Sequence, residues 1–276
     1  MSFLRSISSI AMLALVVSAA TTSRAQISAI DENSFASSPI DSSGEAISLP
    51  VLLPHLSPDL ALATCQRALQ EQSSELAGYT ATTVIEAELT DSAQKAEFEL
   101  KQHYAAPGIL EFTPIHSSGD GFVKSNVIVR LLQSEVEHVQ KREQWKTAIN
   151  FENYKFSYKG EAQLNGTAAH VYEVKPRHKR VGLFKGRIYV DAADGSLLRA
   201  QGRIAKSPSF FIKRIDFVQD YATIGGFTVP VHLHSEAQTR VVGKAVVDVL
   251  LKDYRPEIAS TNSDVASARS LAAITR

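Results

Sequence analysis

Residues 79–104 read YTATTVIEAELTDSAQKAEFELKQHY, and this stretch decides the fold because apolar residues recur at every second position. Glutamate and lysine occupy most of the alternate positions. A strand with this period buries one face and exposes the other, so the stretch predicts a half-buried antiparallel hairpin. The positions on its apolar side are Tyr79, Ala81, Thr83, Ile85, Ala87, Leu89, Ala96, Phe98, Leu100 and Tyr104.

The same alternation continues along most of the chain. Further strands are expected near residues 109–113, 151–159, 168–175, 184–191, 196–205, 210–219, 227–235 and 240–254. Pairs such as Asn165-Gly166 and Gly225-Gly226 supply tight turns between them. Short links between about ten strands predict an antiparallel meander, and a sheet of that width curls or closes. The predicted fold class is mainly β (α+β).

Two segments have helical spacing instead. Ser57-Pro58-Asp59 supplies a cap, a first-turn proline and an acidic residue, which predicts a helix over 58–77 that stops at Gly78. A second helix is expected over 122–141, after the turn Gly119-Asp120-Gly121. We expect these two helices to cover the concave side of the sheet or its open mouth.

The two ends of the chain read differently from its centre. Residues 1–25 combine Arg5, the apolar run Ile10–Ala20 and the small residues of Ser23-Arg24-Ala25, which is typical of a secretory signal peptide. No later stretch is apolar enough to predict a transmembrane segment in the mature chain. Residues 26–56 are interpreted as a flexible leader, 57–255 as the folded domain and 256–276 as a C-terminal tail.

Composition excludes several classes of function. The chain has 276 residues, 44% of them hydrophobic, with 29 lysine plus arginine against 29 aspartate plus glutamate. Because positive and negative charges balance, the protein has no overall positive field that would attract the phosphates of nucleic acid, and nucleic-acid binding is not expected. The single cysteine, Cys65, excludes an internal disulfide and a cysteine-rich zinc site, and it is expected to be buried in the first helix.

Aromatic residues at alternate positions suggest a pocket. Tyr154, Phe156 and Tyr158 share one face of a predicted strand. Two interpretations stay open: these side chains fill an ordinary core, or they line an apolar concavity that holds a lipid or acyl chain. The lipid-binding candidates on the second interpretation are Phe98, Leu100, Phe112, Tyr154, Phe156, Tyr158, Ile188 and Phe217.

The most basic stretch, KPRHKR at 175–180, offers candidates for binding anionic head groups or a partner protein. A solvated hairpin loop is the alternative. These candidates are Lys175, Arg177, Lys179 and Arg180.

Signals for catalysis or metal binding are weak. His232 and His234 point to the same side of a strand, but no carboxylate or cysteine nearby in the sequence completes a ligand set, so no metal or other cofactor is predicted. The chain lacks GxSxG, HExxH and GxxxxGK[ST] motifs, which favours a protein that is not an enzyme.

Several passages resemble a known family. The segment GRIYVDAADGSLLRA at 186–200, together with YEVKP at 172–176 and GFTVP at 226–230, is similar to the LolA-like, outer-membrane lipoprotein-sorting superfamily of bacterial periplasmic proteins. The likeness spans roughly residues 57–255. It implies an incomplete β-barrel whose helices form a lid over a hydrophobic cavity, and a periplasmic location. Members of that superfamily carry lipoprotein acyl chains, shuttle other lipids or serve as envelope sensor domains.

Three hypotheses about function follow. The leading one is a monomeric, non-catalytic periplasmic carrier that binds lipid or the acyl chains of a lipoprotein. The second is an envelope sensor or protein-interaction domain with a protein partner on the same fold. The third is a hydrolase-type enzyme that uses scattered histidine and acidic residues.

Overall fold

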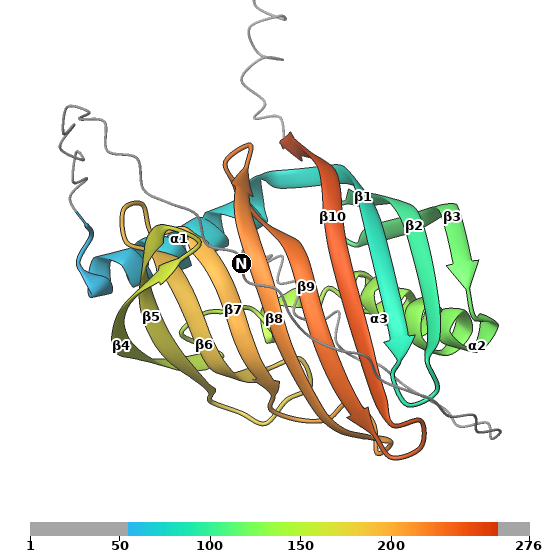
Figure 1. Cartoon of the computed structure of the whole chain (residues 1–276). Helices are drawn as coiled ribbons and strands as arrows, with labels where there is room; N and C mark the ends of the chain where they lie inside the picture. Colours follow the sequence, from blue (N-terminus) through green and yellow to red (C-terminus); the bar gives the residue numbers. More distant parts are fainter. Residues whose placement is uncertain (1–54, 259–276) are drawn as a thin grey trace, which may run out of the picture.

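The computed structural model of the chain describes residues 55–258. The predicted signal peptide 1–25, nearly all of the predicted leader and residues 259–276 of the predicted tail lie outside the described residues. The described part forms one antiparallel sheet of 10 strands in the order β3-β2-β1-β10-β9-β8-β7-β6-β5-β4 (Figure 1). The strands are β1 (Leu76–Leu89), β2 (Gln94–Ala105), β3 (Ile109–Gly119), β4 (Tyr154–Leu164), β5 (Thr167–Pro176), β6 (Phe184–Asp191), β7 (Leu197–Ile204), β8 (Ile212–Ile224), β9 (Phe227–Thr239) and β10 (Lys244–Ile258).

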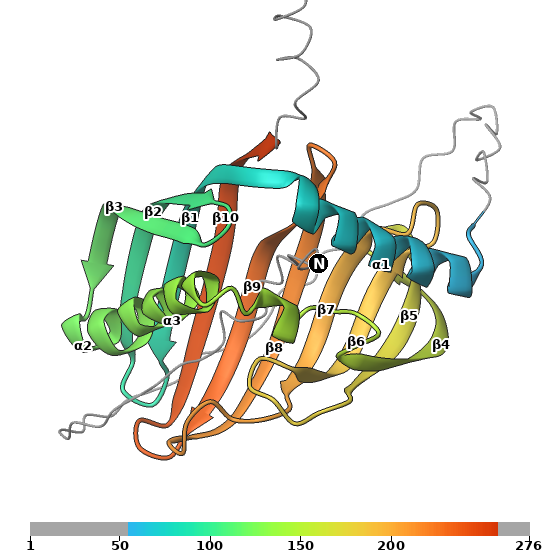
Figure 2. The ribbon, with the colours of Figure 1, turned by 180° about the vertical axis from the view of Figure 1, so that it is seen from behind.

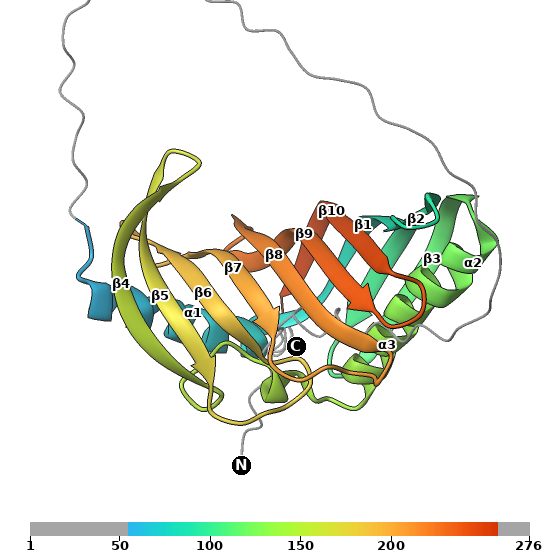
Figure 3. The ribbon, with the colours of Figure 1, turned by 60° about the horizontal axis from the view of Figure 1, so that its bottom comes forward.

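The sheet is curved but not closed, because β3 and β4 remain as separate edges (Figure 3). This confirms the predicted fold class, an incomplete barrel built mainly of antiparallel strands. The Asn165-Gly166 turn is also confirmed, since φ is 51° at Asn165 and 83° at Gly166 where β4 returns as β5. Both values are those of the hairpin turn that an Asn-Gly pair favours.

The helices lie on one face of this sheet, which we call the inner face (Figure 2). They are α1 (Pro58–Glu75), a one-turn α2 (Gly121–Val123) that continues through a π-helical segment (Lys124–Ile128) into α3 (Val129–Gln140), and a 3₁₀ turn (Gln144–Lys146). Residues 120–153 join β3 to β4, the two opposite edges, so this segment must cross the whole width of the sheet. The strand order thus explains why a helix covers the inner face. No helix of residues 55–258 lies on the opposite, outer face (Figure 1).

Helix α1 begins as the sequence predicts and ends earlier than expected. The Ser57 hydroxyl accepts a hydrogen bond from the Leu60 amide at 3.4 Å, and Pro58 occupies the first turn. The helix ends at Glu75 and β1 starts at Leu76, so Gly78 is a strand residue and not the cap. A side chain at Gly78 would lie against the backbone oxygen of Tyr104 on β2, which explains the glycine by strand packing instead.

Gly119 closes β3 in a left-handed conformation, with φ at 86°. A Cβ atom there would collide with the backbone oxygen of Lys95, so the position requires glycine. Asp120 then caps the helical segment, because its Oδ1 accepts a hydrogen bond from the Val123 amide at 2.9 Å. The predicted turn at 119–121 and the predicted helix that follows are both present.

The core lies between the inner face and the helices. Around β4–β8 it is aromatic: the Phe184 ring lies 5.4 Å from that of Tyr154 and 5.1 Å from that of Phe217, centroid to centroid. Cys65 on α1 is buried as expected, and burial raises the pKa of its thiol to about 12. A separate, smaller cluster lies around Tyr104, Val139 and Phe227 at the other end of the sheet.

Gln72 fastens the end of α1 to β9. Its side-chain amide donates to the Thr228 carbonyl at 2.9 Å, and its Oε1 accepts from the Thr228 amide at 2.7 Å. Replacing Gln72 with alanine should lower the free energy of unfolding by about 1–2 kcal/mol, because two partly buried backbone groups of Thr228 lose their partners. Urea denaturation measures this loss. Gln70→Ala, at an exposed position on the same helix, is the control and should change stability by less than about 0.5 kcal/mol.

Candidate functional site

A pocket opens on the inner face where strands from the two ends of the chain meet. It encloses about 630 Å³, counting the open space at its mouth. Its walls come from α1, α3 and the strands β1, β2, β3, β8, β9 and β10. Apolar side chains form much of the wall, among them Phe112, Val231, Leu233, Val249 and Leu251. The closed cavity within this space is only about 50 Å³. Small-molecule sites commonly measure about 300–1,000 Å³, so a long-chain ligand would require the helical segment over the pocket to move.

Three polar side chains form a chain of hydrogen bonds at one wall of the pocket. The Thr83 hydroxyl donates to Gln102 Oε1 at 2.7 Å, and Gln102 Nε2 donates to the Tyr79 hydroxyl oxygen at 2.7 Å. Tyr79 therefore keeps its own O–H proton for another acceptor. Its ring stacks between Tyr104, at 5.2 Å, and Tyr254, at 5.0 Å, which fixes its position.

Glu135 of α3 supplies the one carboxylate among the described residues that line this pocket. Its Oε2 atom is buried and has no hydrogen-bond partner within residues 55–258. Burial raises the pKa of Glu135 to about 7. Burial and the nearby Glu135 both raise the pKa of Tyr79, so the phenol stays protonated. The site therefore combines an apolar wall with one acidic acceptor and one hydroxyl donor.

Sequence reasoning missed Glu135, although a signal was present. The residue lies four positions after Leu131 and four before Val139, so helical spacing places it on the same face as these two buried residues. A carboxylate on the apolar face of a helix is the pattern that could have indicated it. The pattern does not show how deeply the Glu135 carboxylate is buried, because that depends on the strands against which α3 packs.

The predicted lipid-binding residues are placed unevenly. Phe112 lines the pocket. Tyr154, Ile188, Phe217 and Leu100 are nearly inaccessible and belong to the core, which also packs against Phe98 and Phe156. Tyr158 is 44% exposed near the β4 edge, where its ring lies 5.6 Å from that of Tyr172. Contact of these residues with a lipid stays a prediction, and the pocket lies toward the other end of the sheet.

Both arginines of the basic stretch form hydrogen bonds with backbone carbonyl groups elsewhere in the fold. Arg177 Nε donates to the Phe151 carbonyl at 2.8 Å, and Arg180 donates to the Lys146 carbonyl at 3.3 Å. Lys175 forms an ion pair with Glu173 at 3.0 Å. These contacts support the structural interpretation of Arg177 and Arg180. Lys179 is exposed. Binding of head groups or a partner by this stretch stays a prediction.

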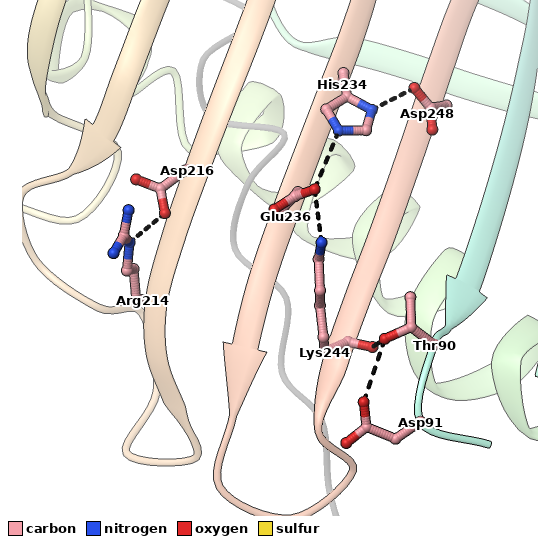
Figure 4. Close-up of polar contacts among 8 residues, drawn as sticks. All are labelled: Thr90, Asp91, Arg214, Asp216, His234, Glu236, Lys244 and Asp248. Carbon is pink, nitrogen blue, oxygen red and sulfur yellow. Dashed lines mark hydrogen bonds and ion pairs between the residues drawn. The ribbon is translucent and has the colours of Figure 1, made fainter. Parts of the chain in front are cut away.

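His234 lies on the outer face, where β9 pairs with β10 (Figure 4). His232 is two positions earlier on β9 and therefore points to the same side. The sequence indicated no carboxylate near them, but Asp248 on β10 lies directly opposite His234. Asp248 Oδ1 is 2.8 Å from His234 Nδ1 and 3.5 Å from His232 Nε2. Pairing of the consecutive strands β9 and β10 brings this aspartate to the histidines, and the register of that pairing is not visible in the residues around the histidines.

The contacts extend into a line of alternating charges across the outer face. Glu236 Oε1 lies 3.7 Å from His234 Nε2 and accepts from Lys244 Nζ at 2.7 Å (Figure 4). The Lys244 hydrogen bond holds the pKa of Glu236 below its usual value. At the other end, Asp220 pairs with His232 and Arg199. Because each partner is partly exposed, these pairs contribute little stability individually.

Residues 55–258 contain neither a cluster of metal ligands nor a helix that could span a membrane. Within this range, no group of three or more histidine, cysteine, aspartate or glutamate residues is arranged to hold a metal ion. Helices of the described part are all too short or too polar to cross a bilayer.

No family model and no curated protein matches this chain. Solved structures do match. A domain from Vibrio parahaemolyticus described as an outer-membrane lipoprotein-sorting protein is 10% identical, covers 77% of this chain and 99% of its own, and has a TM-score of 0.39. A DUF1329 family protein from Desulfovibrio piger is 11% identical, with 74% and 95% covered and a TM-score of 0.37. A LolA superfamily protein from Nitrosomonas europaea is 8% identical, with 74% and 96% covered and a TM-score of 0.34. Structures of the superfamily that the sequence resembles are thus among those similar to this chain.

Proposed function

We propose that the protein is a non-catalytic, periplasmic carrier that binds a lipid or an acyl chain in the pocket between the sheet and α3. The observation that carries this proposal is the pocket itself, with an apolar wall formed by strands on both sides of the β1–β10 pair. Removing an acyl chain from water into such a pocket is worth about 0.8 kcal/mol per methylene. The signal peptide at 1–25 would deliver the protein to the periplasm.

Reversible binding requires that the ligand can enter and leave. The helical segment 121–140 covers one side of the pocket through Glu135, and it is held at its start by the Asp120 cap. Gly119 is packed against β2, whereas a Cβ atom at Gly121 would meet open space. If the segment moves to admit a ligand, Gly121 is therefore the freer of the two glycines at its start.

Filling the pocket should abolish lipid binding while the fold survives. In Val249→Phe the larger ring would occupy space inside the pocket, because Val249 lines it from β10. Overpacking costs about 1–3 kcal/mol, so thermal melting must first establish that the variant is folded. The measurement is extraction of the purified protein followed by mass spectrometry of bound lipid. The expected result is lipid in the native protein and at least a tenfold smaller amount in the variant.

Val246→Phe is the matched control for that experiment. Val246 lies on the same strand but on the outer face, three positions before Val249. This variant should keep its lipid. Equal loss from both variants, or a native protein that neither carries extractable lipid nor binds added long-chain amphiphiles, would contradict the carrier function.

The second candidate function is a protein-interaction domain of the envelope. It is favoured by exposed apolar side chains at the ends of the β7–β8 and β9–β10 connections, where Phe210 is 77% and Val241 44% exposed. Arg240 covers part of this surface, with its guanidinium carbon 4.7 Å from the Phe210 ring centroid. Chemical cross-linking in intact cells tests it, because a stable complex would show a cross-linked species at these two connections.

A further inference from the structure

We propose that the pocket selects amphiphiles whose polar end donates a hydrogen bond and carries no negative charge, and that Glu135 is the residue that receives this polar end. The ligand class is therefore a long-chain alcohol, amide or amine, in preference to a carboxylate or a phosphate. This inference rests on the proposed carrier function and specifies which ligands that function serves.

The first observation is an acceptor without a donor. Glu135 Oε2 is buried, lines the pocket, and has no hydrogen-bond partner among the described residues. An unpaired buried carboxylate oxygen costs the protein stability, and a fold that packed this face only for its own sake would place an apolar residue there. A ligand that donates a hydrogen bond to Oε2 would remove that cost.

The second observation is the direction of the hydrogen bonds in the opposite wall. The chain from Thr83 through Gln102 ends on the Tyr79 oxygen, so the remaining proton of this chain is the Tyr79 hydroxyl proton. Tyr79 and Glu135 line the same pocket and lie near enough for Glu135 to raise the pKa of Tyr79. A ligand hydroxyl can both donate to Glu135 and accept from Tyr79, whereas an amine supplies donors only.

The third observation is the sign of the charge. Apart from Glu135, the described lining residues that carry ionisable groups are Tyr79, Tyr254 and His232. The His232 ring lies on the outer face, where it contacts Asp220 and Asp248 at 3.7 and 3.5 Å, so it does not supply a cation to the pocket. Lysine and arginine are absent from the described lining. An anionic head group would enter beside a buried carboxylate with no cation to compensate it, which is unfavourable.

Three probes with the same chain length separate the contributions of hydrogen bonding and of head-group charge to binding. Dodecanol, dodecylamine and dodecanoate are titrated below their aggregation limits into the purified, delipidated full-length protein at pH 8, and dissociation constants are measured by calorimetry. We expect dodecanol and dodecylamine to bind at least tenfold more tightly than dodecanoate. Comparison of the first two shows whether acceptance from Tyr79 or the positive charge contributes more to binding.

Glu135→Gln then tests the residue. The amide keeps the size of the side chain and removes its charge, so the preference against dodecanoate should fall at least fivefold and dodecylamine should bind more weakly. Glu137→Gln is the matched control, because Glu137 is exposed on the same helix and pairs with Lys141 at 3.0 Å. It should leave all three constants within a factor of two.

The outcomes distinguish the inference from the function on which it rests. If dodecanoate binds the native protein as tightly as dodecanol, or if Glu135→Gln leaves the ratio unchanged, the selectivity is wrong while the carrier function stands. If none of the three probes binds, both are wrong. If the preference against dodecanoate is lost in Glu135→Gln and kept in Glu137→Gln, the result supports Glu135 as the residue that receives the polar end of the ligand.

Discussion

Replacing Glu135 with glutamine is expected to raise the free energy of unfolding by roughly 2–3 kcal/mol at pH 8 and to leave it nearly unchanged at pH 4. Burial raises the pKa of Glu135 from 4.5 to about 7 in the folded protein. Between pH 4.5 and pH 7, Glu135 is therefore mostly protonated in the folded state and mostly ionised in the unfolded state. The native protein therefore loses stability from this group as the pH rises from about 4.5 through 7, and glutamine removes that loss.

Urea denaturation of both proteins at several pH values measures this difference. Other groups near the helix also titrate, among them His138, whose pKa is lowered by burial, but their effects are common to both proteins and cancel in the comparison. Glu137→Gln should differ from the native protein by less than about 0.5 kcal/mol at both extremes. A stability difference between Glu135→Gln and the native protein that does not vary with pH would show that Glu135 is ionised normally.

Replacing Phe184 with alanine should cost about 3–5 kcal/mol of folding free energy. Phe184 is completely buried on β6 between the rings of Tyr154 and Phe217. Its backbone amide also donates to the Tyr154 hydroxyl at 3.3 Å, so the two residues are joined by both packing and a hydrogen bond. Removal of the ring leaves a cavity that neighbours on several strands can only partly fill. Chemical denaturation or thermal melting measures the loss.

The same substitution decides how the aromatic end of the sheet works. Phe210→Ala is the control, since that ring is 77% exposed, and it should change stability by less than about 0.5 kcal/mol. If Phe184→Ala were as harmless as Phe210→Ala but abolished lipid binding, these aromatics would line a ligand site. A large loss of stability instead identifies them as the core that supports the pocket at the other end.

Local features of the fold were predictable from the sequence because they depend on neighbouring residues. The alternation from Tyr79 to Leu89 predicted β1, and Ser57 with Pro58 predicted the start of α1. The end of α1 was not predictable from Gly78. A glycine is needed there because the backbone of β2 approaches closely, and not because the helix ends at this residue. Strand β3 also runs beyond the predicted limit of 113 to Gly119, since pairing with β2 extends it.

Features that depend on how the strands pair could not be predicted from the sequence. Asp248 lies beside His234 because of the register in which β10 pairs with β9. Glu135 reaches the pocket because the segment that joins the two edge strands, β3 and β4, crosses the inner face. Residues within a single strand specify neither the register nor that path. The aromatic stripe at Tyr154 showed correctly that one face is buried, but a stripe that fills a core and a stripe that lines a pocket have the same period.

The pairing of β1 with β10 also has a consequence for the order in which the molecule assembles. The three strands β1, β2 and β3 are synthesised first, yet they join the rest of the sheet through the strand that is synthesised last. Until residue 258 has left the ribosome, this early hairpin unit has an unpaired edge and no permanent neighbour. Completion of the sheet is thus a late, long-range event, and a nascent chain arrested before β10 would present that open edge to any other strand it meets.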